Sequence, residues 1–302
     1  MLQVVISPAK KMRIDTDVVE PAGIPPFPKK SRALLHRLRD MTRDELKDLW
    51  GTSDKLTDEN LERLRVLEVP LSLDEARGTH MMPRLTPAIF SYDGIQYTSL
   101  APSVLDETAL EWLQGHLWIL SGFYGCVRPF DAVMPYRLEM GASLEMPAPD
   151  DHSCSASGSG RAHATRSLYE LWGGDIAAAV TGSRSNIPCD TGSTPASSFG
   201  STPAVDTVVN LASVEYAKAV LPHLPEGVRS VTCIFGELLR NDKPVQRATA
   251  SKIARGSMLR WMAENGIEDP ADLLRFSTGY AFAPELSRTD AHGNETIVFM
   301  RS

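Results

Sequence analysis

The stretch from Trp118 to Gly141 reads WILSGFYGCVRPFDAVMPYRLEMG. It holds two prolines, two arginines and two tyrosines without a clean period, so it is neither a regular core element nor a polar linker. Gly122 and Gly125 enclose an apolar pair after an apolar segment, as in helix-hairpin-helix motifs whose backbone N–H groups meet a DNA phosphate. The two prolines that follow would limit a second helix to a turn or two.

The same stretch also offers polar side chains suited to an anion. Arg128 and Arg137 carry planar guanidinium groups that can bind a phosphate with two hydrogen bonds. Tyr136 and Glu139 flank the second arginine, and Glu139 could orient it toward a ligand. The alternative is an arginine–glutamate ion pair that holds a loop against the core.

Composition limits the class of protein. The chain has 302 residues, 42% of them hydrophobic, and a formal net charge of −7, which suits a soluble globular protein with a substantial core. No apolar run approaches the ~18–20 residues that span a bilayer. The first residues place their lysines after the apolar run, the reverse of a secretory signal. Four scattered cysteines without a CxxC pair favour a reducing cytoplasm over a disulfide framework or a zinc site.

Hydrophobic periodicity predicts a mixture of strands and helices, hence a mixed α/β (α+β) fold in one domain over residues 1–302, with a mixed sheet and surrounding helices. A capping box at Thr42 and Glu45 predicts a helix start. Gly266 is a plausible stop for the longest helix. Strands are expected at residues 2–7, 206–212, 228–235, 279–284 and 296–301. Helices are expected at residues 31–41, 42–50, 58–67, 168–180, 213–221 and 247–266. Residues 87–100 are expected to form an extended pair, and residues 106–120 a helix whose end is uncertain.

Two segments, 150–166 and 181–206, are rich in Ser, Gly, Ala, Thr and Pro. Such composition has little to bury and predicts mobile surface insertions. The GSGR sequence in the first could also grip a phosphate. No GxxxxGK[ST] motif is present, which excludes a P-loop.

Polar residues also follow predicted strands. Ser7 and Lys10 follow the first strand, and Asn210 and Ser213 close or follow a later one, at positions where α/β proteins often present ligand groups. Asp54 and Lys55 lie between two predicted helices. Solvated lysines and a simple helix cap are the alternative explanations.

The long helix over 247–266 has a basic face. Lys252, Arg255, Gly256 and Arg260 fall within about 140° of arc, with the glycine near the middle. A helical glycine costs about 1 kcal/mol relative to alanine, so close approach of another group would explain it. That group is either an anion, which we favour, or a second helix.

These motifs together resemble the YaaA peroxide-stress family. The matching pieces are ISPAKK at Ile6, SDKL at Ser53, LSGFYGCVRPFDAVMPYRLEMG at Leu120, LYELWGGDI at Leu168, VVNLASVEY at Val208 and KIARGSMLRW at Lys252, in family order over nearly the whole chain. This sequence departs from the family in two ways. It carries the two insertions, and it has Asp93 before Gly94 where the family motif FxGDVY has Gly before Asp.

The resemblance implies a cytoplasmic bacterial protein that protects cells and their DNA during peroxide stress and limits free iron. It also implies a positively charged cleft and a helix-hairpin-helix-like element that bind duplex and branched DNA without sequence preference. On this chain the cleft would include Lys10, Lys55, Arg128, Arg137, Lys252, Arg255 and Arg260.

Three functions remain in competition. The first is DNA binding, with no cofactor, no bound metal and no membrane partner. The second is an enzyme acting on a small phosphorylated or nucleotide substrate in the same cleft, although no reaction can be identified and we expect a binding protein. The third is direct iron sequestration. The seven histidines are scattered without ExxH or HxxxH spacing, which argues against it.

Overall fold

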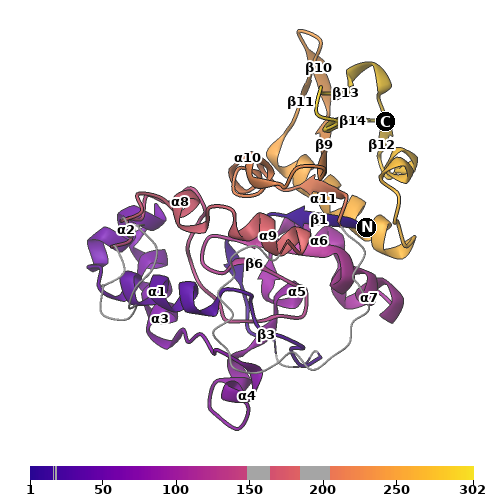
Figure 1. Ribbon diagram of the computed structural model, residues 1–302. Coiled ribbons are helices and arrows are strands. Elements are labelled where there is room, and N and C mark those ends of the chain that lie inside the picture. Colours follow the sequence, from indigo (N-terminus) through magenta and orange to yellow (C-terminus); the bar gives the residue numbers. More distant parts are fainter. Residues whose placement is uncertain (16, 18, 148–163, 184–204) are drawn as a thin grey trace.

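The computed structural model describes residues 1–147, 164–183 and 205–302, apart from residues 16 and 18 (Figure 1). The predicted insertions at 150–166 and 181–206 fall largely outside the described residues. An eight-stranded mixed sheet forms the centre, in the order β12-β14-β9-β8-β1-β5-β6 with β13 paired to β14. The mixed α/β fold class is confirmed.

The middle of the sheet is parallel. Strand β1 (Leu2–Ile6) pairs in parallel with β5 (Leu117–Ser121) and β8 (Thr207–Leu211), and β8 continues through β9 (Arg229–Gly236) to β14 (Glu295–Arg301). All residues of β1, β5 and β8 are buried, as expected of parallel strands covered on both faces. The predicted strands are thus confirmed within a residue or two at their ends. Antiparallel strands at the sheet's margins are β6 (Gly125–Val127), β12 (Tyr280–Phe282) and β13 (Arg288–Thr289).

Three N-terminal helices, α1 (Pro28–Arg39), α2 (Arg43–Trp50) and α3 (Asp54–Val66), gather on one side of the molecule (Figure 1). The predicted capping box is confirmed: the Thr42 side chain accepts from the Glu45 backbone, and the Glu45 side chain accepts from the Thr42 backbone. The longest helix, α11 (Ala248–Glu264), ends before Gly266, which has a φ of 56°.

The remaining elements are short. Residues 168–180 form two helices rather than one, because Gly173 adopts a φ of 45° between them. The other helices and strands are β2 (Lys11–Met12), α4 (Leu73–Ala76), β3 (Thr86–Pro87), α7 (Glu107–His116), β7 (Ala132–Val133), α8 (Leu168–Trp172), α9 (Asp175–Thr181), α10 (Val214–Ala217), β10 (Leu238–Arg240) and β11 (Lys243–Val245), with 3₁₀ turns at Met82–Arg84, Pro102–Val104, Leu221–His223, Pro270–Arg275 and Pro284–Leu286.

The expected extended pair at 87–100 is wrong. This segment forms α5 (Ala88–Ser91), the two-residue strand β4 (Tyr92–Asp93) and α6 (Ile95–Leu100). Helix α6 packs closely along α11, which buries Tyr97 and Leu100. Tertiary packing therefore overrides the local preference of these aromatic and β-branched residues for strands.

The expected helix-hairpin-helix at Gly122 and Gly125 is also wrong. The segment turns from β5 directly into β6, and the turn residues Phe123 and Tyr124 are buried. Their backbone N–H groups donate to Ser121 Oγ at 3.2 and 2.8 Å, so they are not free to meet a phosphate.

The two glycines are required by this β-hairpin instead. A Cβ on Gly122 would lie 2.6 Å from the Leu138 carbonyl oxygen, and Gly125 has a φ of 76° with the Trp172 ring against it.

Candidate functional site

A cleft of about 470 Å³ lies where β1 and β8 end. Five segments that are distant in sequence form its walls: residues 7–11 after β1, 93–97 at the start of α6, 136–139 after β7, 213–216 around α10, and one face of α11. The lining residues are Ser7, Pro8, Ala9, Lys10, Lys11, Asp93, Gly94, Ile95, Gln96, Tyr97, Tyr136, Arg137, Leu138, Glu139, Ser213, Glu215, Tyr216, Lys252 and Arg255.

The structure thus brings together four of the predicted basic residues, Lys10, Arg137, Lys252 and Arg255. Four of the predicted polar residues join them: Ser7, Tyr136, Glu139 and Ser213.

Two serines join the strand ends. Ser7 Oγ donates to Ser213 Oγ at 3.2 Å and accepts from the Ser213 backbone N–H at 2.8 Å. Tyr97 Oη donates to the Ser7 carbonyl oxygen at 3.0 Å. Because β1 and β8 are parallel neighbours, their carboxyl ends meet at one edge of the sheet, which is where open α/β sheets bind ligands.

Tyr136 lines the cleft, and its hydroxyl is bonded to buried neighbours. Its Oη lies 2.7 Å from Ser121 Oγ and 3.1 Å from Tyr92 Oη. Burial raises the pKa of Tyr136 to about 12, so the phenol stays protonated at neutral pH.

Most charges in the cleft are paired. Glu139 binds Lys10 Nζ at 2.8 Å through one carboxylate oxygen and Arg137 Nη2 at 2.7 Å through the other. Lys11 and Asp93 form a further ion pair at 2.5 Å. The arginine–glutamate pair was the structural alternative for Arg137, and it is present. Five cations face three carboxylates overall, so the cleft carries a positive excess.

That excess is concentrated on α11. Arg255 is partly buried, and within the described residues it makes no hydrogen bond or ion pair; its Nε is buried without an acceptor. Burial lowers the pKa of Arg255. Lys252, one turn earlier, is exposed and has no ion pair in the described part of the chain. A partly buried cation without a counter-charge gains from a nearby anion, so this point in the cleft favours one.

Gly256 does not open the cleft to an anion. A Cβ at this position would lie 2.1 Å from the Gln96 carbonyl oxygen and 2.8 Å from Ser99 Cβ. The glycine therefore permits close packing of α11 on α6, and the second-helix explanation replaces the anion explanation.

Arg128 is a structural residue rather than a cleft residue. Its guanidinium carbon lies 3.9 Å from the centroid of the Trp118 ring. Its Nη1 donates to Gln3 Oε1 and to the carbonyl oxygens of Gln114 and Gly115 at 3.1 to 3.3 Å. These contacts leave it inside the fold, away from the cleft lining.

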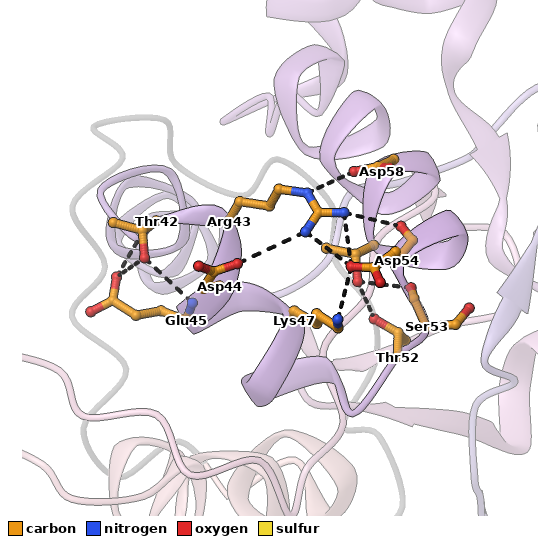
Figure 2. Close-up of polar contacts among 10 residues, drawn as sticks. Thr42, Arg43, Asp44, Glu45, Lys47, Thr52, Ser53, Asp54 and Asp58 are labelled. Atoms are coloured by element: carbon orange, nitrogen blue, oxygen red, sulfur yellow. Dashed lines mark hydrogen bonds and ion pairs between the residues drawn. The ribbon is translucent and has the colours of Figure 1, made fainter.

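The other predicted charged residues also lie outside the cleft. Asp54 Oδ1 binds Arg43 Nη1 at 3.1 Å and Lys47 Nζ at 2.8 Å, which ties α2 to α3 (Figure 2). Hydrogen bonds from Lys47 and Arg43 hold the pKa of Asp54 below its usual value. Lys55 is exposed on the same helix, and Arg260 pairs with Glu264 at 2.8 Å.

Asn210 closes β8 beside a second cavity of about 360 Å³. Its side chain donates to Thr232 Oγ1 at 3.3 Å and accepts from the Ala212 N–H at 2.9 Å. Arg255 lines this cavity as well as the cleft, so it forms part of the wall between them.

Gln96 was missed by sequence reasoning. It is 6% exposed and lines the cleft, and its Nε2 has no hydrogen-bond acceptor in the described structure. The sequence IQYTSL at 95–100 gives no signal that singles out Gln96, because Thr98 and Ser99 are polar as well.

The described residues contain no group of three or more His, Cys, Asp and Glu side chains placed to hold a metal ion. Within the same residues, no helix combines the length and apolar character needed to cross a bilayer.

The fold and site define a mixed α/β protein with a cleft of net positive charge at the carboxyl edge of its sheet. A family model described as peroxide stress protein YaaA matches residues 2–286, so the chain belongs to this family. It is 37% identical over 290 residues to a UPF0246 protein of Pediococcus pentosaceus, with 96% of each chain covered. It is 33% identical over 302 residues to a UPF0246 protein of Desulfitobacterium hafniense, covering 100% and 98% of the two chains.

Proposed function

We propose that this member of the peroxide stress family protects cells against oxidative damage by binding DNA phosphates in the cleft. The observation that carries the proposal is Arg255, a partly buried arginine that lacks any hydrogen-bond or ion-pair partner within the described residues and lies one helical turn from Lys252. A guanidinium binds a phosphate, as it does a carboxylate, through two parallel hydrogen bonds.

The cleft supports recognition of phosphate rather than of base sequence. Lys252 and Arg255 both come from one face of α11, and Arg137 and Lys10 line the same cleft with Glu139 between them. Such contacts would supply affinity without reading base edges. The overall charge of −7 opposes binding of a polyanion, so the attraction must come from the local positive excess in this cleft.

A salt titration tests the proposal. Binding to a fully paired duplex and to a branched DNA is measured between low and moderate salt. Log affinity should fall linearly with log salt, with a slope that becomes shallower by about one unit when Lys252 is changed to Ala. Arg260→Ala, on the same helix but outside the cleft, should leave the slope unchanged. Affinity that does not respond to salt overturns the proposal.

Any limitation of free iron would be indirect. The described residues offer no cluster of metal-ligating side chains, which gives direct sequestration no support. Protein that takes up stoichiometric iron after purification would contradict this part of the proposal.

A second candidate is an enzyme acting on a small phosphorylated or nucleotide substrate. The observation in its favour is the volume of the cleft, about 470 Å³, within the ~300–1,000 Å³ usual for small-molecule sites. Tyr136, Arg137 and Glu139 would supply hydrogen-bonding and charged groups beside the substrate. Conversion of nucleotides during incubation with purified protein, lost in Arg255→Met, would favour the enzyme.

A further inference from the structure

The volume of the cleft is that of a small-ligand site. A cavity of about 470 Å³ lies within the ~300–1,000 Å³ usual for such sites, so only a small part of a DNA chain could enter it. Arg255, which has no ion pair within the described residues, lines this cavity. The ligand that reaches Arg255 is therefore of small-molecule size, or is a single unit of a longer chain.

We propose that the cleft binds one nucleotide unit, with its phosphate on Arg255 and Lys252 and its base against Gln96. The nucleotide is either free or an unpaired nucleotide of DNA. For an unpaired nucleotide of DNA, the inference rests on the proposed DNA-binding function. For a free nucleotide, it does not.

The phosphate end of the site is defined by α11. Arg255 and Lys252 lie three residues apart, so their side chains share one helix face, and both line the cleft. Neither has an ion pair within the described residues, whereas Lys10, Lys11 and Arg137 all have carboxylate partners. The positive charge left for a ligand is thus at this end.

The base end is defined by Gln96. Its side chain is buried and lines the cleft, and its Nε2 has no acceptor within the described residues, which is unfavourable for a buried amide. A ring nitrogen or carbonyl oxygen of a base would accept this hydrogen bond. Glu215 lines the same cleft and accepts the Gly141 N–H through Oε1, while no partner of its Oε2 is found in the described structure, so it can accept from an exocyclic amine.

Aromatic side chains complete the argument for a nucleotide over a sugar phosphate. Tyr97, Tyr136 and Tyr216 all line the cleft, together with Ile95 and Leu138. Aromatic and apolar side chains beside an amide suit a heteroaromatic ring. Enzymes and binding proteins that take a nucleotide out of a duplex enclose it with aromatic and apolar side chains and read its edge by hydrogen bonds.

The test uses the full-length protein and two kinds of probe. Calorimetric titration with the four deoxynucleoside 5′-monophosphates, and with the matching nucleosides, measures the free ligand. Titration with a paired duplex, and with the same duplex carrying one extra unpaired nucleotide, measures the affinity for an unpaired nucleotide within DNA. We expect a nucleotide to bind more tightly than its nucleoside, or the bulged duplex to bind more tightly than the paired one.

The variants assign the effect to the proposed residues. Arg255→Met and Gln96→Met should each reduce binding about tenfold to hundredfold, because each removes a donor to the ligand. Both should melt no earlier than the wild type, since neither Arg255 Nε nor Gln96 Nε2 has a partner to lose. Arg260→Ala is the matched control and should bind as the wild type does.

The outcomes separate this inference from the proposed function. Binding of the paired duplex with no gain from the unpaired nucleotide, and no binding of free nucleotides, overturns the single-nucleotide site and leaves DNA binding standing. Binding of free nucleotides without any DNA binding supports the site and overturns the DNA function. Binding that persists at wild-type strength in both Met variants overturns the residue assignment.

Discussion

Gly256 of α11 lies against the backbone of Gln96 in α6, so closely that a Cβ at position 256 would come within 2.1 Å of the Gln96 carbonyl oxygen. The contact places the unpaired amide of Gln96 and the unpaired guanidinium of Arg255 in the same cleft, since each is adjacent to the crossing point. The helix crossing therefore fixes the distance between the Gln96 amide and the Arg255 guanidinium, the two groups that we propose donate hydrogen bonds to a ligand.

Substitution of Gly256 should destabilise the fold. Gly256→Ala forces α11 away from α6, and overpacking of this kind costs about 1–3 kcal/mol. Urea denaturation measures the free energy of unfolding. Gly115→Ala in α7 is the control, because a Cβ there meets nothing within 4 Å and removal of a helical glycine should be neutral or stabilising. Equal stability of the two variants would show that α6 and α11 are free to separate.

The helix crossing also explains where sequence reasoning failed. The strand at Leu2–Ile6 and the cap at Thr42 were predictable, because an apolar run and a capping box are local signals. The helix at Ile95–Leu100 was not, because it is stabilised by a helix more than 140 residues later in the chain. The turn at Gly122 was misassigned for the same kind of reason, since the groups that crowd it come from residues 138 and 139.

The lining of the candidate cleft was predictable only in part. Lys10 and Arg255 line it, as predicted from a position after a strand and from a basic helix face. Arg128 is indistinguishable from them in sequence. What removes it from the site is the pairing of β1 with β5, which brings Gln3 and Trp118 around its guanidinium.

Arg128 should therefore matter for folding. Arg128→Ala removes the stacking on Trp118 and three hydrogen bonds, and leaves Gln3 Oε1 with one donor fewer. We expect a loss of about 2–4 kcal/mol in unfolding free energy. Thermal and urea denaturation measure it, and the salt slope of DNA binding by the remaining folded protein should not change. An unaltered melt with a shallower salt slope would return Arg128 to the binding residues.

Gly125 should likewise affect the fold and not the ligand. Its φ of 76° is unfavourable for any other residue, and a Cβ would lie 2.9 Å from the Trp172 ring. Gly125→Ala should lower the melting temperature by several degrees, as expected for a loss of about 1–3 kcal/mol. Differential scanning calorimetry makes the comparison with Gly174→Ala, where a Cβ meets nothing within 4 Å. If Gly125→Ala melts normally but no longer binds phosphate, the hairpin belongs to the site after all.

Asp131 makes the stability of the protein depend on pH. The residue is 5% exposed, its Oδ2 accepts the Arg128 backbone N–H at 2.7 Å, and burial raises the pKa of its carboxyl to about 7. An unfolded aspartate titrates near 3.9. The folded state thus holds a proton that the unfolded state has lost, and stability contributed by this group is present below about pH 4 and falls as pH rises to about 7.

Asp131→Asn should remove this dependence, because an amide oxygen still accepts the Arg128 N–H and carries no charge. Unfolding free energies of the wild type and Asp131→Asn are measured by urea denaturation from pH 4 to pH 8. Relative to the variant, the wild type should lose stability across this range, by at most about 4 kcal/mol. Parallel pH profiles would contradict the raised pKa, and a wild type that gains stability relative to the variant as pH rises would mean that Asp131 is ionised in the fold and stabilised by Arg128.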